Sequence, residues 1–173
     1  MHIRPLTETD AEAFRALRLR ALTEEPDAFG SSADEFARTP LAEIARRFLP
    51  TEDAFTLGAW TPDLVGMVRL SREERVKTRH KAVIQSVYVA PEARGRGIGR
   101  ALMAEALTRA AALPGLEQVI LTVTATNTAA VALYRSLGFT AYGTEPHALK
   151  IGDRYVDEEL MVWRSGEAMS NEQ

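Results

Sequence analysis

The chain has 173 residues, a length typical of one domain, and its 46% hydrophobic and 26% charged residues are close to the average for soluble globular proteins. This composition excludes a disordered or collagen-like chain for the bulk of the molecule. A formal net charge of −3 excludes a molecule-wide basic field suited to gripping nucleic acid.

The chain contains no cysteine, which excludes disulfides, thiolate metal or iron–sulfur sites, and a cysteine acyl intermediate. Its three histidines, His2, His80 and His147, lie far apart in sequence, so we expect no metal site. The first ten residues lack the apolar run of a signal peptide, and no segment approaches the ~20 apolar residues of a membrane span. We therefore expect a cytoplasmic protein that binds neither membrane nor nucleic acid.

Hydrophobic periodicity and turn residues predict the elements of the first half. Phe14, Leu17 and Leu22 form an apolar stripe at helical spacing, and Pro40 suits the first position of a second helix. The predicted order is a strand over 2–6, a helix over 9–23, an irregular polar segment over 27–39, a helix over 41–49, and a hairpin of strands over 55–60 and 64–70.

The second half alternates apolar runs with helical patterns. Asn127 is a good N-cap and Gly138 a good left-handed stop for a helix between them. The predicted order is a charged, solvated connection over 72–81, a strand over 82–89, a helix over 98–113, a strand over 119–124, a helix over 128–137, and closing strands over 139–143 and 155–163 joined by a long loop. We expect one domain over 1–164 and a disordered polar tail over 165–173.

The segment between the strand over 82–89 and the helix over 98–113 is the most informative. Glycines at 95, 97 and 99 would let a phosphate approach exposed helix N-terminal amides, and Arg94, Arg96 and Arg100 add positive charge there. Neither the P-loop pattern nor the dinucleotide fingerprint fits this spacing. The segment therefore predicts a site for a pyrophosphate-bearing ligand, with a tight turn carrying solvated arginines as the alternative.

Two patterns resemble the GNAT superfamily of N-acetyltransferases. The first is Arg94-x-x-Gly97-x-Gly99, and the second, one strand and one helix later, is Asn127-x-x-Ala130-x-x-Leu133-Tyr134-x-x-Leu137-Gly138-Phe139. The resemblance covers roughly residues 1–164. It implies an α+β fold with α/β/α layers, in which about four helices flank a mixed, mostly antiparallel sheet of about seven strands with a splayed parallel pair.

The resemblance also implies acetyl-CoA as co-substrate. Backbone groups of Val87 and Val89 would then pair with the pantetheine arm, and amides from Gly95 to Arg100, including those of Arg96, Gly97 and Gly99, would hold the pyrophosphate near Arg94. Asn127 would contact the arm, a role that can coexist with helix capping. The implied reaction is direct acetyl transfer to a primary amine of a small molecule or peptide.

Tyr134 is our candidate general acid for the leaving thiolate, and its alternative role is simple packing. The Val87 amide is our candidate hydrogen-bond donor to the carbonyl oxygen of the thioester. Many members of the family carry a carboxylate base on the strand that corresponds to 82–89, where this chain has only Gln85 and Ser86. Each of the other candidates for the base or for the acceptor pocket could instead be an ordinary surface or packing residue. The carboxylates are Glu35, Asp157 and Glu158; the further acceptor-side candidates are His147, Phe29, Phe36 and Tyr155, with His80 for an anionic acceptor.

Two other functions remain open from the sequence. The missing strand carboxylate would suit a non-catalytic acyl-CoA-binding sensor, and the glycine loop could belong to a nucleotide-binding protein. Homodimers are common in the resembled family, although the sequence carries no interface signal. The acceptor is not specified by any motif.

Overall fold

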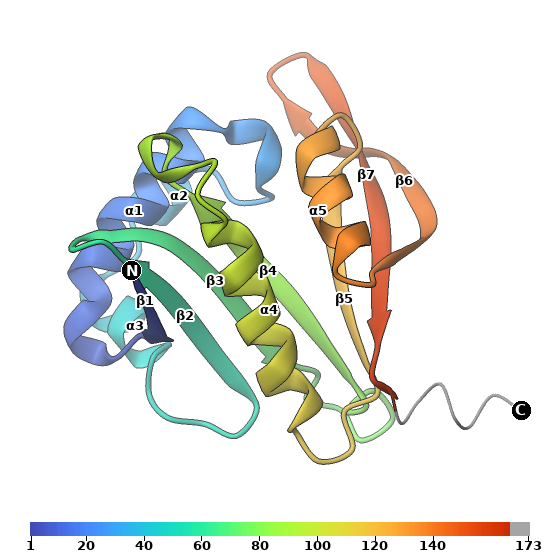
Figure 1. The fold of residues 1–173 in the computed structure, drawn as a ribbon. Coiled ribbons are helices and arrows are strands. Elements are labelled where there is room, and N and C mark those ends of the chain that lie inside the picture. The colour runs from blue at the N-terminus through green and yellow to red at the C-terminus, as the bar shows by residue number, and fades with distance from the viewer. Residues whose placement is uncertain (167–173) are drawn as a thin grey trace, which may run out of the picture.

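The structure is a computed structural model, and it describes residues 1–166. Seven strands form one sheet in the order β1-β2-β3-β4-β5-β7-β6, in which only the β4–β5 pair is parallel (Figure 1). The strands are β1 (His2–Pro5), β2 (Ala54–Trp60), β3 (Leu64–Arg72), β4 (Lys81–Val89), β5 (Gln118–Thr124), β6 (Thr140–Ile151) and β7 (Arg154–Arg164). The predicted mixed sheet with its parallel pair is confirmed.

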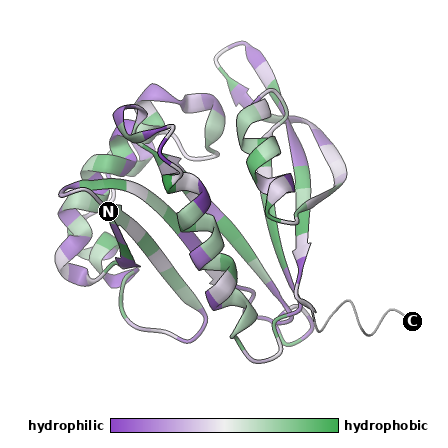
Figure 2. Cartoon of the chain, in the orientation of Figure 1, coloured by the Kyte–Doolittle hydropathy of each residue, from purple (hydrophilic) through white to green (hydrophobic). Residues whose placement is uncertain are grey.

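Helices cover both faces of this sheet (Figure 1). They are α1 (Ala11–Glu24), α2 (Ala33–Ala37), α3 (Leu41–Arg46), α4 (Ile98–Ala111) and α5 (Thr128–Ser136), with short 3₁₀ turns at Glu8–Asp10, Pro26–Ala28 and Pro91–Ala93. One buried cluster joins α4 and α5 to the sheet, and a second joins α1, α2 and α3 to its other face. Hydrophobic residues are accordingly frequent along the strands and helices, as the colouring of Figure 2 shows.

Residues 27–39 are more ordered than we predicted. The 3₁₀ turn Pro26–Ala28 overlaps the start of this segment, and helix α2 lies within it. Ser32 caps α2, since its hydroxyl accepts from the Glu35 amide, and the Glu35 carboxylate accepts from the Ser32 amide in return. This reciprocal cap was readable in the sequence, but a five-residue helix offers too few apolar positions for periodicity to register.

The prediction of a long loop between the closing strands is wrong. Strand β6 continues to Ile151 and pairs with β7 across a tight turn at Gly152, with an irregularity between Glu145 and Leu149. Most of this hairpin is exposed, so neither face carries the apolar alternation from which strands are recognised.

The chain end departs from the prediction at one residue. Ser165, expected to begin a frayed tail, is buried, and its amide donates to the Glu117 carbonyl (2.9 Å). Residues 167–173 of the predicted tail lie outside the described residues. Within residues 1–166, no helix is both long and apolar enough to cross a membrane.

An ion pair ties β1 to the start of α1. Arg4 donates two hydrogen bonds to Asp10 (2.7 and 2.8 Å), and the Thr7 amide donates a third (2.8 Å). The Arg4 hydrogen bond is the main reason that the pKa of Asp10 falls to about 2. Because this pKa lies below the unfolded value of about 3.9, the stabilisation is complete above pH 4 and is lost as pH falls toward 2.

We therefore expect Asp10→Asn to reduce the free energy of unfolding by about 1 kcal/mol at pH 7, a modest amount because solvent screens the part-exposed Arg4. Urea denaturation at pH 7 and pH 3 measures the effect, and the difference from wild type should shrink at pH 3. An equal difference at both pH values would contradict this assignment.

Candidate active site

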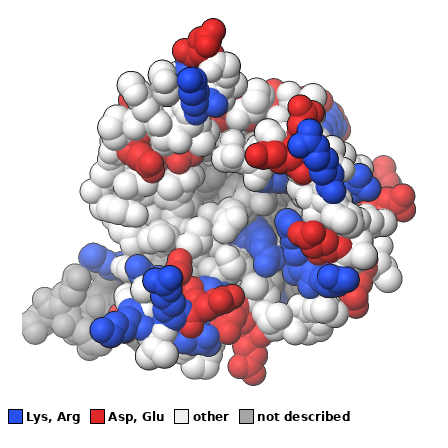
Figure 3. Space-filling model, turned by 180° about the vertical axis from the view of Figure 1, so that it is seen from behind, with Lys and Arg blue, Asp and Glu red and all other residues white. Residues whose placement is uncertain are grey.

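The parallel strands β4 and β5 separate after three residue pairs. Lys81, Ala82 and Val83 pair with Gln118, Val119 and Ile120, and beyond them the two strands diverge (Figure 1). A cavity of about 780 Å³ lies between the strands and is lined by both, by the start of α4, by α5 and by residues 28–31. Figure 3 shows the molecule hollowed between its two halves, with lysine and arginine side chains gathered beside the hollow. Because the strands diverge, the backbone groups along one edge of each are exposed to the cavity. A ligand there could form hydrogen bonds with these groups as a further strand would.

A bulge interrupts β4 where it borders the cavity. Gln85 pairs with Arg69 and Tyr88 with Met67, which leaves Ser86 and Val87 opposite a single residue of β3. Ser86 has φ of 57°, in the left-handed region that non-glycine residues rarely adopt. Such bulges redirect backbone groups and are over-represented beside active sites.

The predicted glycine loop lies at one end of the cavity. Gly95 and Gly97 have φ of 72° and 76°, and a side chain at either position would meet nothing within 4 Å. These glycines therefore serve the backbone conformation rather than tight packing. Gly97 precedes the first turn of α4 without a side-chain cap, so the first amides of the helix are free to bind an anion.

The three arginines of this loop are placed differently from one another. Arg94 and Arg100 line the cavity, whereas Arg96 is exposed outside it. The Arg94 guanidinium pairs with Glu25 and donates to the Val89 carbonyl (2.9 Å).

Arg100, in the first turn of α4, donates to the Ser136 hydroxyl on α5 (2.8 Å). This contact joins the first turn of α4 to the last turn of α5 across the cavity end. Arg94 and Arg100 are therefore the two loop cations positioned to act on a bound anion.

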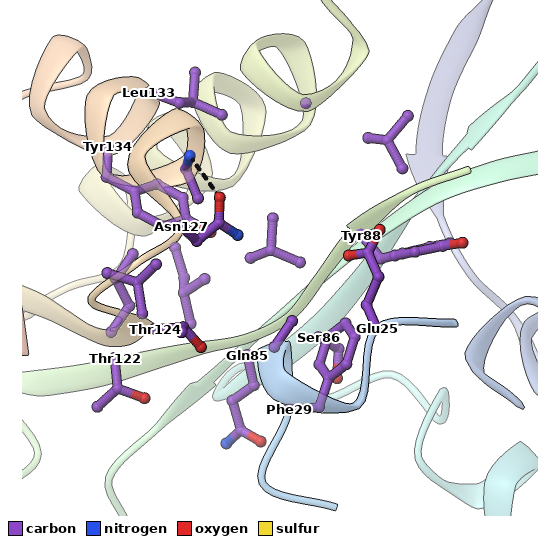
Figure 4. A pocket seen from close by; sticks show the side chains of 18 of the residues that line it. Glu25, Phe29, Gln85, Ser86, Tyr88, Thr122, Thr124, Asn127, Leu133 and Tyr134 are labelled. Carbon is purple, nitrogen blue, oxygen red and sulfur yellow. Dashed lines mark hydrogen bonds between the residues drawn. The ribbon is translucent and has the colours of Figure 1, made fainter. Parts of the chain in front are cut away.

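Asn127 and Tyr134 line the opposite wall (Figure 4). The Asn127 carbonyl oxygen accepts from the Ala130 amide (3.2 Å), so its capping role is present. Tyr134 is 6% exposed and packs against Phe139 at 5.9 Å between ring centroids. Burial raises the pKa of Tyr134 to about 12, so the phenol keeps its proton at neutral pH.

The acceptor-side candidates divide into two groups. Gln85, Ser86, Phe29 and Glu158 line the cavity. The other candidates lie outside the cavity. Glu35 is part of the α2 cap, Phe36 is buried in the core, and the His80 carbonyl accepts from the Glu117 amide. Tyr155 is exposed, with the His147 ring stacked on it at 4.5 Å between ring centroids, and the Asp157 carboxylate accepts from the His147 amide.

Of the three carboxylates that we considered as the base, Glu158 is the one that lines the cavity. It stands on β7 opposite Thr124, with Glu145 of β6 on its other side. Burial raises the pKa of Glu158, and the neighbouring Glu145 adds to the effect, while the Thr122 hydroxyl acts in the opposite direction. A carboxylate with a raised pKa is a better proton acceptor near neutral pH than an ordinary glutamate.

Two charged residues that line the cavity, Arg18 and Glu25, were not singled out from the sequence. The segment that follows α1 crosses toward β5 and β7: the Thr124 hydroxyl donates to the Asp27 carbonyl, and Arg154 pairs with Asp27. These tertiary contacts hold Glu25 beside the cavity, and no local pattern encodes them. Arg18 did leave a signal, which is a charge within the apolar stripe of α1.

The comparisons with known proteins agree with this geometry. The family model described as "Acetyltransferase (GNAT) family" matches residues 15–139. The chain belongs to the GNAT family of acetyltransferases. A GNAT phosphinothricin acetyltransferase from Sinorhizobium meliloti, solved with acetyl-CoA, superposes with a TM-score of 0.84 at 24% identity, over 99% of this chain and 91% of that one.

Two curated relatives differ in the substrates that their names state. A mycothiol acetyltransferase of Salinispora arenicola is 38% identical over 78% of this chain and 42% of its own length. A spermidine N(1)-acetyltransferase of Vibrio cholerae is 28% identical over 80% of this chain and 75% of its own. This GNAT chain thus spans less than half of the mycothiol relative, and membership of the family does not select an acceptor.

Acetyl-CoA is the co-substrate of the GNAT family, and this site fits it. The diverging strand edges suit an amide-bearing arm, and the uncapped start of α4 suits a diphosphate. When bound, acetyl-CoA supplies the activated acetyl thioester. Among residues 1–166, no group of three or more histidine, aspartate or glutamate side chains is placed to hold a metal ion.

Proposed function

We propose that this protein transfers the acetyl group of acetyl-CoA directly to a primary amine. The observation that carries the proposal is the single cavity that joins a glycine-capped helix N-terminus to a buried, protonated phenol and a carboxylate with a raised pKa. Those groups are the anion site, the acid and the base that the transfer needs.

Three residues carry the chemical steps in this proposal. Glu158 takes a proton from the acceptor ammonium, whose ordinary pKa is near ~10, and the free amine nitrogen then bonds to the thioester carbonyl carbon. The Val87 amide donates to the carbonyl oxygen as negative charge develops there. As the carbon–sulfur bond breaks, Tyr134 gives its proton to the leaving thiolate, and its phenolate is reprotonated by the second proton that the nitrogen loses as the neutral amide forms.

Other residues bind the two parts of acetyl-CoA, its diphosphate and its pantetheine arm. Amides from Gly95 to Arg100 hold the diphosphate with Arg94 and Arg100 beside it, while Val87, Val89 and Asn127 hold the pantetheine. The test is release of free thiol from acetyl-CoA across a panel of amino acids, polyamines, aminoglycosides and peptides. Micromolar CoA binding without turnover on any amine would indicate a binding module instead.

The base assignment predicts a distinctive pH profile. Glu158→Gln should lower kcat/KM about 100-fold at neutral pH, because general-base catalysis contributes roughly 10²–10⁴-fold. Wild-type activity should fall as pH drops through the raised pKa of Glu158, which must be deprotonated to act. The variant should instead gain activity steadily toward pH 10, as the fraction of free amine grows.

Glu145→Gln supplies the matched control. This change removes the neighbouring negative charge that helps to raise the pKa of Glu158, so the acid limb should move to lower pH while the plateau activity stays. An unchanged acid limb in Glu158→Gln would remove this residue from the base role.

A further inference from the structure

Arg18 is a charged residue within the apolar stripe of α1. It stands four residues after Phe14 and four before Leu22, both of which are buried, and it is itself only 8% exposed. Its side chain lines the same cavity as the catalytic candidates. A helix that follows ordinary amphipathic patterning would carry an apolar residue here.

This guanidinium has no anionic partner among residues 1–166. Within this range its Nη1 atom is buried without a hydrogen-bond partner, and no ion pair between described residues involves Arg18. Burial, and to a smaller extent the positive charge of Arg47, lower the pKa of Arg18 to about 10, so it stays positive at neutral pH. Buried charges without partners are costly and therefore rare outside functional sites.

The surroundings hold the guanidinium in place without neutralising it. Its Cζ atom lies 4.5 Å from the centroid of the Phe29 ring, which also lines the cavity. Of the two glutamates that line the cavity, Glu25 is paired with Arg94, and Glu158 stands on β7. The guanidinium of Arg18 therefore lines the cavity with donors that no acceptor within residues 1–166 satisfies.

We propose that Arg18 binds a carboxylate carried by the acceptor, so that the substrates are primary amines with an acidic group, such as amino acids or peptides with a free carboxyl end. The inference rests on the proposed acetyl transfer. The forked donors of a guanidinium match a carboxylate in shape and charge, and the Phe29 ring supports the guanidinium through a cation–π contact. The ammonium end of the acceptor would face Glu158, since α1 and β7 belong to opposite halves of the molecule (Figure 1). Polyamines, which carry only positive charge, would be repelled by Arg18.

The test compares kcat/KM for each acid with that for its neutral amide, for example 4-aminobutanoate with 4-aminobutanamide, and includes putrescine. We expect wild type to prefer the acids at least about 10-fold, the usual scale of a hydrogen bond to a charged group. Arg18→Met should abolish the preference mainly through KM for the acid, with KM for acetyl-CoA unchanged, and Arg18→Lys should keep part of it. Arg15→Met is the control, because Arg15 lies on the same helix but donates to the Ala37 carbonyl outside the cavity.

The outcomes separate this proposal from the proposed function. Equal or better turnover of neutral amides or putrescine by wild type would overturn the carboxylate site and leave acetyl transfer standing, whether or not Arg18→Met folds. If no amine is acetylated, acetyl transfer fails, and calorimetry on the CoA-loaded protein still tests the site. N-acetylated amino acids should then bind wild type at least about 10-fold more tightly than their amides. Equal affinities would overturn the proposal.

Discussion

Replacing Tyr134 by phenylalanine is expected to lower kcat for acetyl transfer about 100-fold, the lower end of what a general acid contributes. The thiolate that leaves from acetyl-CoA would lack its proton donor. The ring, with its contact to Phe139, would remain, so the free energy of unfolding should change by less than about 0.5 kcal/mol. Affinity for CoA should also stay within about threefold, because the hydroxyl, and not the ring, is lost.

Tyr142→Phe is the matched control for this change. Tyr142 also lines the cavity but is 57% exposed on β6, and it has no role in the proposed mechanism. Steady-state kinetics with acetyl-CoA and a turned-over amine measure both variants. If Tyr134→Phe keeps wild-type kcat, the residue packs and does not serve as the acid.

Gly97→Val should weaken CoA binding at least about 10-fold. Gly97 leads into the uncapped first turn of α4 in a left-handed conformation, and a β-branched residue resists that conformation by roughly 1–2 kcal/mol. The loop must then either shift, which misdirects the amides, or keep its shape at a loss of stability. Calorimetric titration with CoA measures the affinity.

Gly152→Val controls for strain alone. Gly152 has a φ of 62° in the β6–β7 turn, and like Gly97 it has no atom near its would-be Cβ. We expect a similar fall in Tm, about 4 °C, with CoA affinity unchanged. Equal losses of CoA affinity in both variants would mean that the glycine loop has no special part in binding.

The glycine loop and the Asn127 cap, to which we assign cofactor binding, could be predicted from the sequence because their signals are local. Gly95, Gly97 and Asn127 are needed for backbone conformation and capping within a few residues of where they act, so spacing along the chain carries the information. The order of strands and helices could be predicted for the same reason, because apolar runs separated by turn residues are local signals.

The acceptor half could not be predicted in the same way. It is assembled from α1, the segment after it, β4 and β7, which tertiary contacts such as the Asp27–Arg154 pair bring together. Asp157 and Glu158 are adjacent acidic residues of β7, and of these two Glu158 lines the cavity; the exposed strand β6 has no apolar alternation from which to read the side of the hairpin that faces the cavity. The bulge at Ser86 likewise arises from pairing with β3 rather than from its own residue type.

Titration of the wild-type protein with CoA and, separately, with pantetheine, which lacks the diphosphate and the nucleotide, tests the central claim most directly. If main-chain donors at the start of α4 hold the diphosphate, CoA should bind with a Kd between about 1 μM and 1 mM, the usual range for enzyme substrates, and pantetheine at least about 100-fold more weakly. No heat with CoA, or equal affinity for the two molecules, would contradict the account.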